Sequence, residues 1–197
     1  MHAFRSVIIA LLLLAAASPG VPDDGSILVP RTSRRTPPPL VLLDLAGKRH
    51  SLEEYRGKVV LVNFFGTWCA PCLQEMPSLI QLASALKDHP FAVLAVDVGD
   101  SPARLRQVFG EQQRAAFTIL LDSTKMAARA WRALAFPTSF VLDTEGSIQY
   151  SVQGPVDWFD PGVARQIVGL LQQGSTPALH NDVERSKAPQ PASPRPD

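Results

Sequence analysis

The strongest constraint on the fold is an apolar run that leads directly into a pair of cysteines. Residues 58–65 read KVVLVNFF, and an almost continuous apolar run of this length is typical of a strand buried on both faces of a sheet. Residues 91–98 and 139–143 have the same character, and residues 71–89 have the apolar spacing of a helix. Strands that alternate with helices predict an α/β fold of three layers, in which a central sheet is flanked by helices.

Two hairpins are predicted near the ends of this α/β arrangement. Residues 40–52 read LVLLDLAGKRHSL, an apolar run, a turn and a second extended piece, which predicts an extra N-terminal β-hairpin. Residues 139–150 contain two extended runs joined by the short loop TEG, which predicts another antiparallel pair. Because helical crossovers join parallel strands and tight loops join antiparallel ones, the central sheet should be mixed.

Composition divides the chain into four parts. Residues 1–18 contain the unbroken apolar run VIIALLLLAAA, which predicts a signal peptide or a retained signal anchor. The run is well short of the roughly 20 residues that a membrane-spanning helix needs. Residues 19–39 predict a Pro-rich linker, residues 40–173 hold the folded domain, and residues 174–197 predict a disordered tail. We therefore expect a periplasmic or secreted protein, or one held on the membrane by its N-terminal apolar segment.

The charge balance argues against nucleic acid as a partner. The chain has 19 Lys and Arg residues against 18 Asp and Glu residues, so its formal net charge is +1. The basic residues are also scattered along the sequence. Binding to a phosphate backbone needs a basic face, so no nucleic-acid partner is expected.

Cys69 and Cys72, the two cysteines of the chain, can serve as a structural disulfide, as metal ligands or as a redox pair. A structural disulfide between them would close a loop too small to stabilise the fold much. A zinc site needs four ligands, and the four histidines show no ligand-like spacing, so no metal is expected. Redox chemistry is the favoured interpretation.

The position of the cysteines indicates how such a pair would work. Cys69 lies where the predicted strand gives way to a helix, and the free N–H groups and dipole of a helix N-terminus stabilise a thiolate. Cys72 lies three residues further along the same helix face, within reach of Cys69. We expect Cys69 to be the exposed nucleophile and Cys72 the more buried resolving thiol, while Pro71 restricts the backbone between them.

The segments VVLVNFFGTWCAPCLQEMPSL (59–79) and FPTSFVLDTEG (136–146) resemble the thioredoxin superfamily, specifically the exported TlpA/ResA/DsbE-like thiol-disulfide oxidoreductases. The resemblance covers about residues 40–173 and implies a thioredoxin-like three-layer fold. It also implies that Pro137 is cis, faces the disulfide and helps to bind an extended substrate segment.

The resemblance assigns further residues to the site. Phe136 and Thr138 flank Pro137 in the substrate-binding loop, and Trp68 packs beside the disulfide and shields it. The other two tryptophans of the chain, Trp131 and Trp158, are interpreted as ordinary core or surface aromatics.

Two polar positions near the cysteines have a family counterpart. Cytosolic thioredoxins place a buried Asp six residues before the first cysteine, whereas this chain has Asn63, which cannot titrate. Some exported relatives place a functional Glu in C-x-x-E-x-P, a pattern that Glu75 fits. Glu75 is therefore a catalytic candidate that holds or releases a proton. The alternative is a solvated charge that favours the helix N-terminus.

The family implies a reaction and partners. We expect reduction of cysteine-containing exported proteins, such as apocytochrome c or copper-site proteins, with a membrane thiol reductase as electron donor. The redox-active Cys69–Cys72 disulfide would need no cofactor, and the protein is expected to be a monomer. A thiol peroxidase and a copper-binding chaperone of thioredoxin-like fold remain alternatives, since two thiolates also suit Cu(I). The sequence of residues 98–124 does not indicate partner choice.

Overall fold

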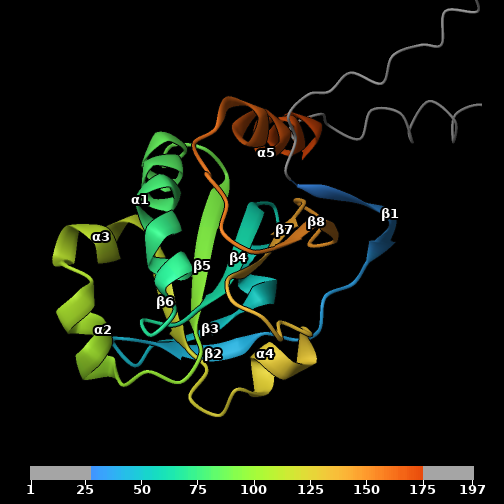
Figure 1. The fold of residues 1–197 in the computed structure, drawn as a ribbon. Coiled ribbons are helices and arrows are strands. Elements are labelled where there is room, and N and C mark those ends of the chain that lie inside the picture. Colours follow the sequence, from blue (N-terminus) through green and yellow to red (C-terminus); the bar gives the residue numbers. More distant parts are fainter. Residues whose placement is uncertain (1–27, 175–197) are drawn as a thin grey trace, which may run out of the picture.

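The computed structural model describes residues 28–174, which form one central sheet with helices on both faces (Figure 1). The eight strands are β1 (Val29–Arg35), β2 (Val41–Asp44), β3 (Arg49–Ser51), β4 (Val59–Phe65), β5 (Phe91–Asp97), β6 (Thr118–Leu121), β7 (Thr138–Leu142) and β8 (Ile148–Gln153). The helices are the 3-10 helix η1 (Leu52–Tyr55) and the α-helices α1 (Ala70–Ala85), α2 (Pro102–Val108), α3 (Glu111–Ala116), α4 (Met126–Ala130) and α5 (Pro161–Gly174).

The sheet is mixed, with the strand order β1-β8-β7-β4-β5-β6-β2-β3. β4, β5 and β6 run parallel to one another, whereas β7 is antiparallel to both β4 and β8. β2 and β3 form the predicted N-terminal hairpin, which joins the sheet through antiparallel pairing of β2 with β6. The thioredoxin-like three-layer fold predicted from the sequence is confirmed.

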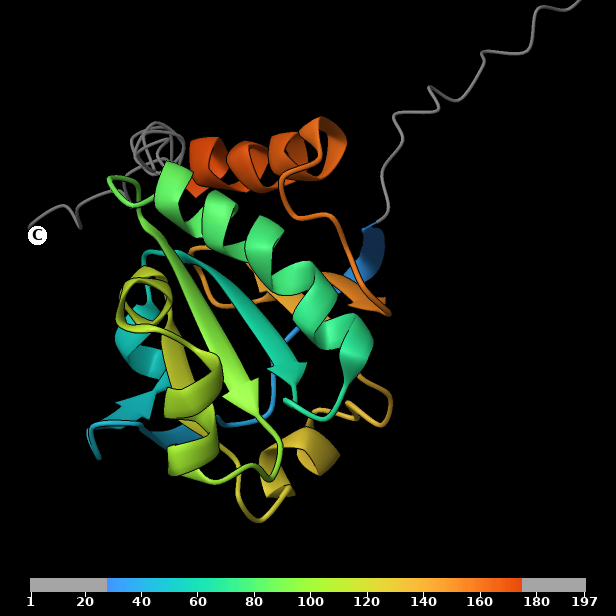
Figure 2. The same cartoon turned by 60° about the vertical axis from the view of Figure 1, so that its left-hand side comes forward.

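The central strand β4 shows how the layers are built. Its residues alternate between two buried clusters: Val59, Leu61 and Phe65 pack on the face covered by α1 and α5, whereas Val60, Val62 and Phe64 pack on the opposite face with α4. Figure 2 shows α1 and α5 on the same face of the sheet. Because side chains of a strand point alternately to its two faces, Asn63 must point toward α1. β4 therefore aims one polar group at the helix that carries the cysteines.

The start of the described chain differs from the prediction. Residues 29–35 lie within the predicted Pro-rich linker of residues 19–39, but they form β1, which pairs antiparallel with β8. Without β1, β8 would be an edge strand with unpaired backbone groups, and a strand added there satisfies them by main-chain hydrogen bonds. Such pairing needs little apolar side-chain surface, so composition did not reveal it. The linker prediction is wrong for this segment.

Most of the other predicted segments lie outside the described residues. These are the predicted signal segment (residues 1–18), residues 19–27 of the predicted linker and residues 175–197 of the predicted tail. α5 ends at Gly174, next to the predicted end of the domain at residue 173. Within residues 28–174, none of the helices has the length and apolar character needed to cross a membrane.

Candidate redox site

The two cysteines lie at the junction of β4 and α1. β4 ends at Phe65, and a turn over residues 66–69 follows, closed by the Cys69 backbone N–H, which donates to the Gly66 carbonyl at 3.1 Å. Cys69 is the N-cap residue of α1, and its sulfur accepts a hydrogen bond from the backbone N–H of Cys72 at 3.3 Å. A helix N-terminus thus offers a backbone donor directly to the Cys69 sulfur.

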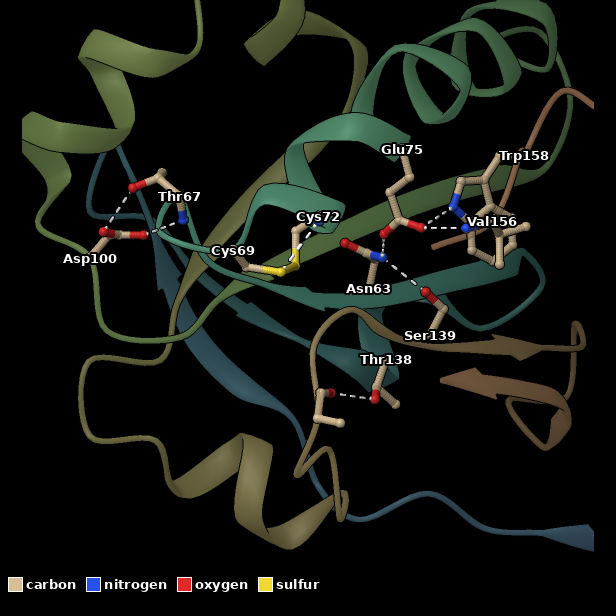
Figure 3. The surroundings of a disulfide bond; sticks show 11 residues. Asn63, Thr67, Cys69, Cys72, Glu75, Asp100, Thr138, Ser139, Val156 and Trp158 are labelled. Atoms are coloured by element: carbon tan, nitrogen blue, oxygen red, sulfur yellow. Dashed lines mark hydrogen bonds between the residues drawn. A yellow bond between two sulfur atoms is a disulfide. The ribbon is translucent and has the colours of Figure 1, made fainter. Parts of the chain in front are cut away.

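Cys69 and Cys72 form a disulfide, with their Cα atoms 5.3 Å apart (Figure 3). Cys72 is completely buried, and Cys69 is only 7% exposed. Cys72 is therefore the more buried thiol, as expected, but the expectation of an exposed Cys69 does not hold in this disulfide state. The Cys69 sulfur points back to the helix amide and to its partner sulfur, so that little of its surface remains accessible.

Aromatic side chains lie on the accessible side of the cysteines. Trp68 is 59% exposed, and its ring meets that of Phe136 edge to face, with the centroids 5.4 Å apart. The indole folds back over Gly66, where a Cβ atom would come within 2.5 Å of the ring. Gly66 is therefore needed for this placement of Trp68, which leaves a broad apolar surface next to the disulfide.

The loop before β7 lies beside the cysteine turn. β7 pairs antiparallel with β4, with Phe64 opposite Thr138, so residues 136–138 reach the end of β4 from which the turn starts. The Phe136–Pro137 peptide bond is cis, as the resemblance implied. Thr138 donates its hydroxyl to the Ala135 carbonyl at 2.6 Å, which fixes the loop (Figure 3). Pro71 is exposed in the first turn of α1.

Glu75 is buried behind the disulfide, with only 3% of its surface exposed. Its Oε1 accepts a hydrogen bond from Asn63 Nδ2 at 2.7 Å, and its Oε2 accepts from the Val156 backbone N–H at 2.9 Å and Trp158 Nε1 at 3.3 Å. Burial raises the pKa of Glu75 to about 7, although these three hydrogen bonds lower it in part. This carboxyl group is not the solvated helix-end charge of the alternative interpretation.

Asn63 connects the cysteine region with Glu75. Its Nδ2 donates to Glu75 and also to Ser139 Oγ at 2.9 Å, whereas its buried Oδ1 finds no hydrogen-bond partner among the residues that the structure describes. In Figure 3 the Asn63 side chain lies between Cys72 and Glu75. A buried unpaired acceptor is costly, so the Asn63 oxygen is open to a donor that the disulfide state lacks.

Trp158 is one of the two tryptophans expected to be ordinary core or surface aromatics, and it lies completely buried in the core. The sequence did not indicate that its indole N–H also donates to Glu75. Its backbone N–H also donates to Ser78 Oγ at 3.0 Å. The segment that carries Trp158 follows β8, and the sequence near Glu75 gives no signal that these distant residues meet.

A cleft borders the residue that carries the buried carboxyl group. It has a volume of about 420 Å³ and lies between α1 and residues 155–157, and Glu75, Ser78 and Val156 contribute to its lining.

A second polar cluster, missed by the sequence analysis, braces the cysteine turn. Thr67 donates its backbone N–H to Asp100 Oδ2 at 2.6 Å and its hydroxyl to Asp100 Oδ1 at 2.9 Å (Figure 3). The backbone N–H of Asp100 donates to Asp97 Oδ2 at 2.9 Å, and Arg104 Nε donates to Thr67 Oγ1 at 3.3 Å. Two aspartates three residues apart, directly after a buried strand, were the signal available in the sequence.

Among residues 28–174, no three or more His, Cys, Asp or Glu side chains are grouped so that they could hold a metal ion.

Comparison with known proteins shows the family. The model of the AhpC/TSA family matches residues 34–151. The chain belongs to the AhpC/TSA family. It is also 38% identical over 119 residues to the thiol-disulfide oxidoreductase ResA of Geobacillus kaustophilus, which covers 60% of this chain and 68% of that one. ResA of Geobacillus thermodenitrificans is 35% identical over 150 residues, 75% of this chain and 84% of that one.

A solved structure points the same way. A thiol:disulfide interchange protein from Chlorobium tepidum, described as DsbE, superposes with a TM-score of 0.62 at 27% identity. The match covers 70% of this chain and 96% of that one. The resemblance stated from the sequence is confirmed, and this AhpC/TSA family member is a thiol-disulfide oxidoreductase of thioredoxin-like fold.

Proposed function

We propose that this oxidoreductase reduces disulfides of exported cysteine-containing proteins through the Cys69–Cys72 dithiol, which serves in place of a cofactor. Apocytochrome c and copper-site proteins are the partner classes, and a membrane thiol reductase restores the dithiol. The protein works as a monomer in the periplasm or outside the cell. The family, the cysteine pair at the N-terminus of α1 and the buried carboxyl group of Glu75 support this proposal.

The exchange proceeds in two balanced steps. The Cys69 thiolate attacks one sulfur of the partner's disulfide, forms a mixed disulfide and releases the partner's other sulfur as a thiolate. Cys72 then loses its proton and attacks the Cys69 sulfur, which releases the partner's second thiolate. Two electrons pass to the partner, and the protein is left with the Cys69–Cys72 disulfide.

Glu75 accepts the proton that Cys72 must lose. A general base works best when its pKa is near the ambient pH, and the pKa of about 7 that burial gives Glu75 meets this condition. Once the disulfide opens, the Cys72 thiol becomes the donor that the unpaired Asn63 Oδ1 lacks. Asn63 then holds the resolving thiol with its oxygen and the carboxylate of Glu75 with its nitrogen.

The groups next to the two sulfur atoms support the reducing direction of the exchange. A cysteine pair is oxidising when its thiolate is strongly stabilised, usually by a neighbouring cation. Across residues 28–174, no described hydrogen bond joins a Lys, Arg or His side chain to the Cys69 or Cys72 sulfur; the described donor is a backbone N–H. The ionisable neighbour one turn away is the acid Glu75. A backbone N–H stabilises the Cys69 thiolate less strongly than a neighbouring cation would, and this favours a pair that gives its electrons away.

The partner's chain binds along the surface beside the cysteines. The exposed ring of Trp68 and the half-buried ring of Phe136 supply apolar area. We place an extended segment of the partner along the loop that contains Pro137 and Thr138. Pro71, exposed in the first turn of α1, borders the same surface. Apolar contacts with these rings position the partner's sulfur at Cys69.

A trapping experiment tests the proposal. Cys72→Ser leaves the mixed disulfide without a resolving thiol, so exported host proteins should accumulate as adducts at Cys69 that dithiothreitol releases. Cys69→Ser is the matched control and should trap no comparable set. Stoichiometric consumption of peroxide without a protein partner would instead support the peroxidase, and tight anaerobic Cu(I) binding by both thiolates would support the chaperone.

A further inference from the structure

The side chains that brace the cysteine turn differ in their protonation state. Asp97 is completely buried, and its Oδ1 finds no hydrogen-bond partner within the described part of the chain. Burial, and then the neighbouring Asp100, raise the pKa of Asp97 to about 8. Burial also acts to raise the pKa of Asp100, but hydrogen bonds from Thr67 and Asp97 and the charge of Arg104 hold it below its usual range. At neutral pH Asp97 therefore keeps its proton while Asp100 is ionised.

Asp97 and Asp100 are joined by a hydrogen bond from the backbone N–H of Asp100 to Asp97 Oδ2, and the Asp100 carboxylate accepts both hydrogen bonds from Thr67. Thr67 is the second residue of the 66–69 turn, and this turn ends at Cys69. Asp100 thus holds the turn through the hydroxyl and the backbone N–H of Thr67, and Asp97 holds Asp100 through the backbone N–H of Asp100.

We propose that Asp97 and Asp100 are positioning residues for thiol-disulfide exchange: Asp100 holds the turn that places the Cys69 sulfur, and the buried Asp97 side chain holds Asp100 through its backbone N–H. Loss of the Asp97 proton sets two carboxylates side by side. Asp100, the more exposed of the two, then gives up its contacts with Thr67, and a negative charge is added near the turn. The inference rests on the proposed role of Cys69 as the attacking thiol.

Arg104, Asp122 and Lys125 are the other charged residues near Asp97. Arg104 donates to Thr67 and to a glutamine of its own helix, and Asp122 accepts hydrogen bonds from two backbone N–H groups of α4. The stem of Lys125 lies over the backbone of the loop between Asp97 and Asp100. The described hydrogen bond to the Asp97 side chain comes from the backbone N–H of Asp100, so Asp100 is the residue that ionisation of Asp97 affects most directly.

The test is the rate at which iodoacetamide alkylates Cys69 in the reduced full-length protein, measured from pH 5 to pH 10. Asp97→Asn keeps a side-chain oxygen that can accept the Asp100 backbone N–H, but it cannot ionise. At pH 6 the rates of wild type and variant should agree. At pH 9, where the Cys69 thiol is ionised in both proteins, the wild type should be slower by at least about threefold, because ionised Asp97 releases the turn that holds the Cys69 sulfur in its reactive position.

Asp122→Asn is the matched control, a buried aspartate that caps α4 and should leave the profile unchanged. The inference would be overturned if the pH profiles of wild type and Asp97→Asn were superimposed, or if the two rates differed by the same factor at every pH. A brace with a merely structural role would not change the ratio of the two rates with pH. Mass mapping of the same samples shows which cysteine reacted. Labelling of Cys72 first would reverse the proposed roles of the cysteines, and this outcome is separate from the pH comparison.

A second measurement needs no variant. Carbon-13 NMR of protein labelled at the aspartate carboxyl groups follows Asp97 directly. Because linkage is reciprocal, the thiolate of the reduced protein should raise the pKa of Asp97 above its value in the disulfide form. Equal titration of Asp97 in the two redox forms contradicts the proposed coupling, even if Asp97→Asn does not fold.

Discussion

Glu75→Gln tests the buried carboxyl group through the pH dependence of stability. In the folded protein the pKa of Glu75 is raised from 4.5 to about 7 by burial. Between these values the folded state keeps a proton that the unfolded state releases, so the free energy of unfolding falls as the pH rises. The stabilisation is complete below pH 4.5 and is lost as the pH passes 7. At 1.36 kcal/mol for each pKa unit, the loss is about 3 kcal/mol.

The substitution removes this pH dependence and adds a constant cost. A glutamine in the same place presents an N–H₂ group to donors such as Val156 and Trp158, so at least one hydrogen bond is lost, at about 1–2 kcal/mol at every pH. Relative to the variant, the wild type should therefore lose about 3 kcal/mol between pH 4.5 and pH 8.5. Asp97 is present in both proteins, so its contribution cancels in the difference.

The assay is urea unfolding of the disulfide form at five pH values, followed by tryptophan fluorescence. Glu54→Gln changes an exposed carboxyl group in the same chemical way and serves as the control, with an expected parallel curve. A wild-type minus Glu75→Gln difference that stays constant from pH 4.5 to pH 8.5 would refute the reasoning, because Glu75 would then titrate as in the unfolded chain.

Three further predictions concern the surface around the disulfide. In the reduced protein at pH 7, Cys69 should be alkylated at least about tenfold faster than Cys72, as mass mapping will show; preferential labelling of Cys72 would reverse the two roles. Gly66→Ala should displace the Trp68 ring and slow exchange with a protein partner several-fold while the melting temperature changes little, and unchanged exchange kinetics would contradict the docking role of that ring. Pro137→Ala should weaken exchange with protein partners more than reaction with dithiothreitol, whereas an equal effect on both would remove the substrate-binding role.

The sequence predicted those features that depend on local pattern. The apolar run before Cys69 predicted the central strand β4, and the short loops predicted the hairpins β2–β3 and β7–β8. Strand burial and tight turns depend on residues that are consecutive in the sequence, so the sequence indicates both. The cis bond before Pro137 followed from family resemblance, and the structure confirms it.

The contacts of the site could not be predicted in this way. Val156 binds Glu75 through its backbone N–H, a group that every residue except proline carries, so residue type gives no signal. The indole of Trp158 reaches Glu75 only because the chain after β8 packs against α1. Asp97 looks like the polar end of a strand, and its proton depends on burial and on Asp100. Each of these contacts depends on tertiary packing.

The reduction potential of the Cys69–Cys72 pair tests the central claim most directly. The full-length protein is equilibrated in dithiothreitol or glutathione buffers at pH 7, and the fraction of dithiol is read by mass after rapid alkylation. We expect a potential near about −270 mV, the range of a reducing thioredoxin, since an acid rather than a cation neighbours the pair. A potential near about −120 mV, that of a strong oxidant, would contradict the account, because such a pair takes electrons from its partners.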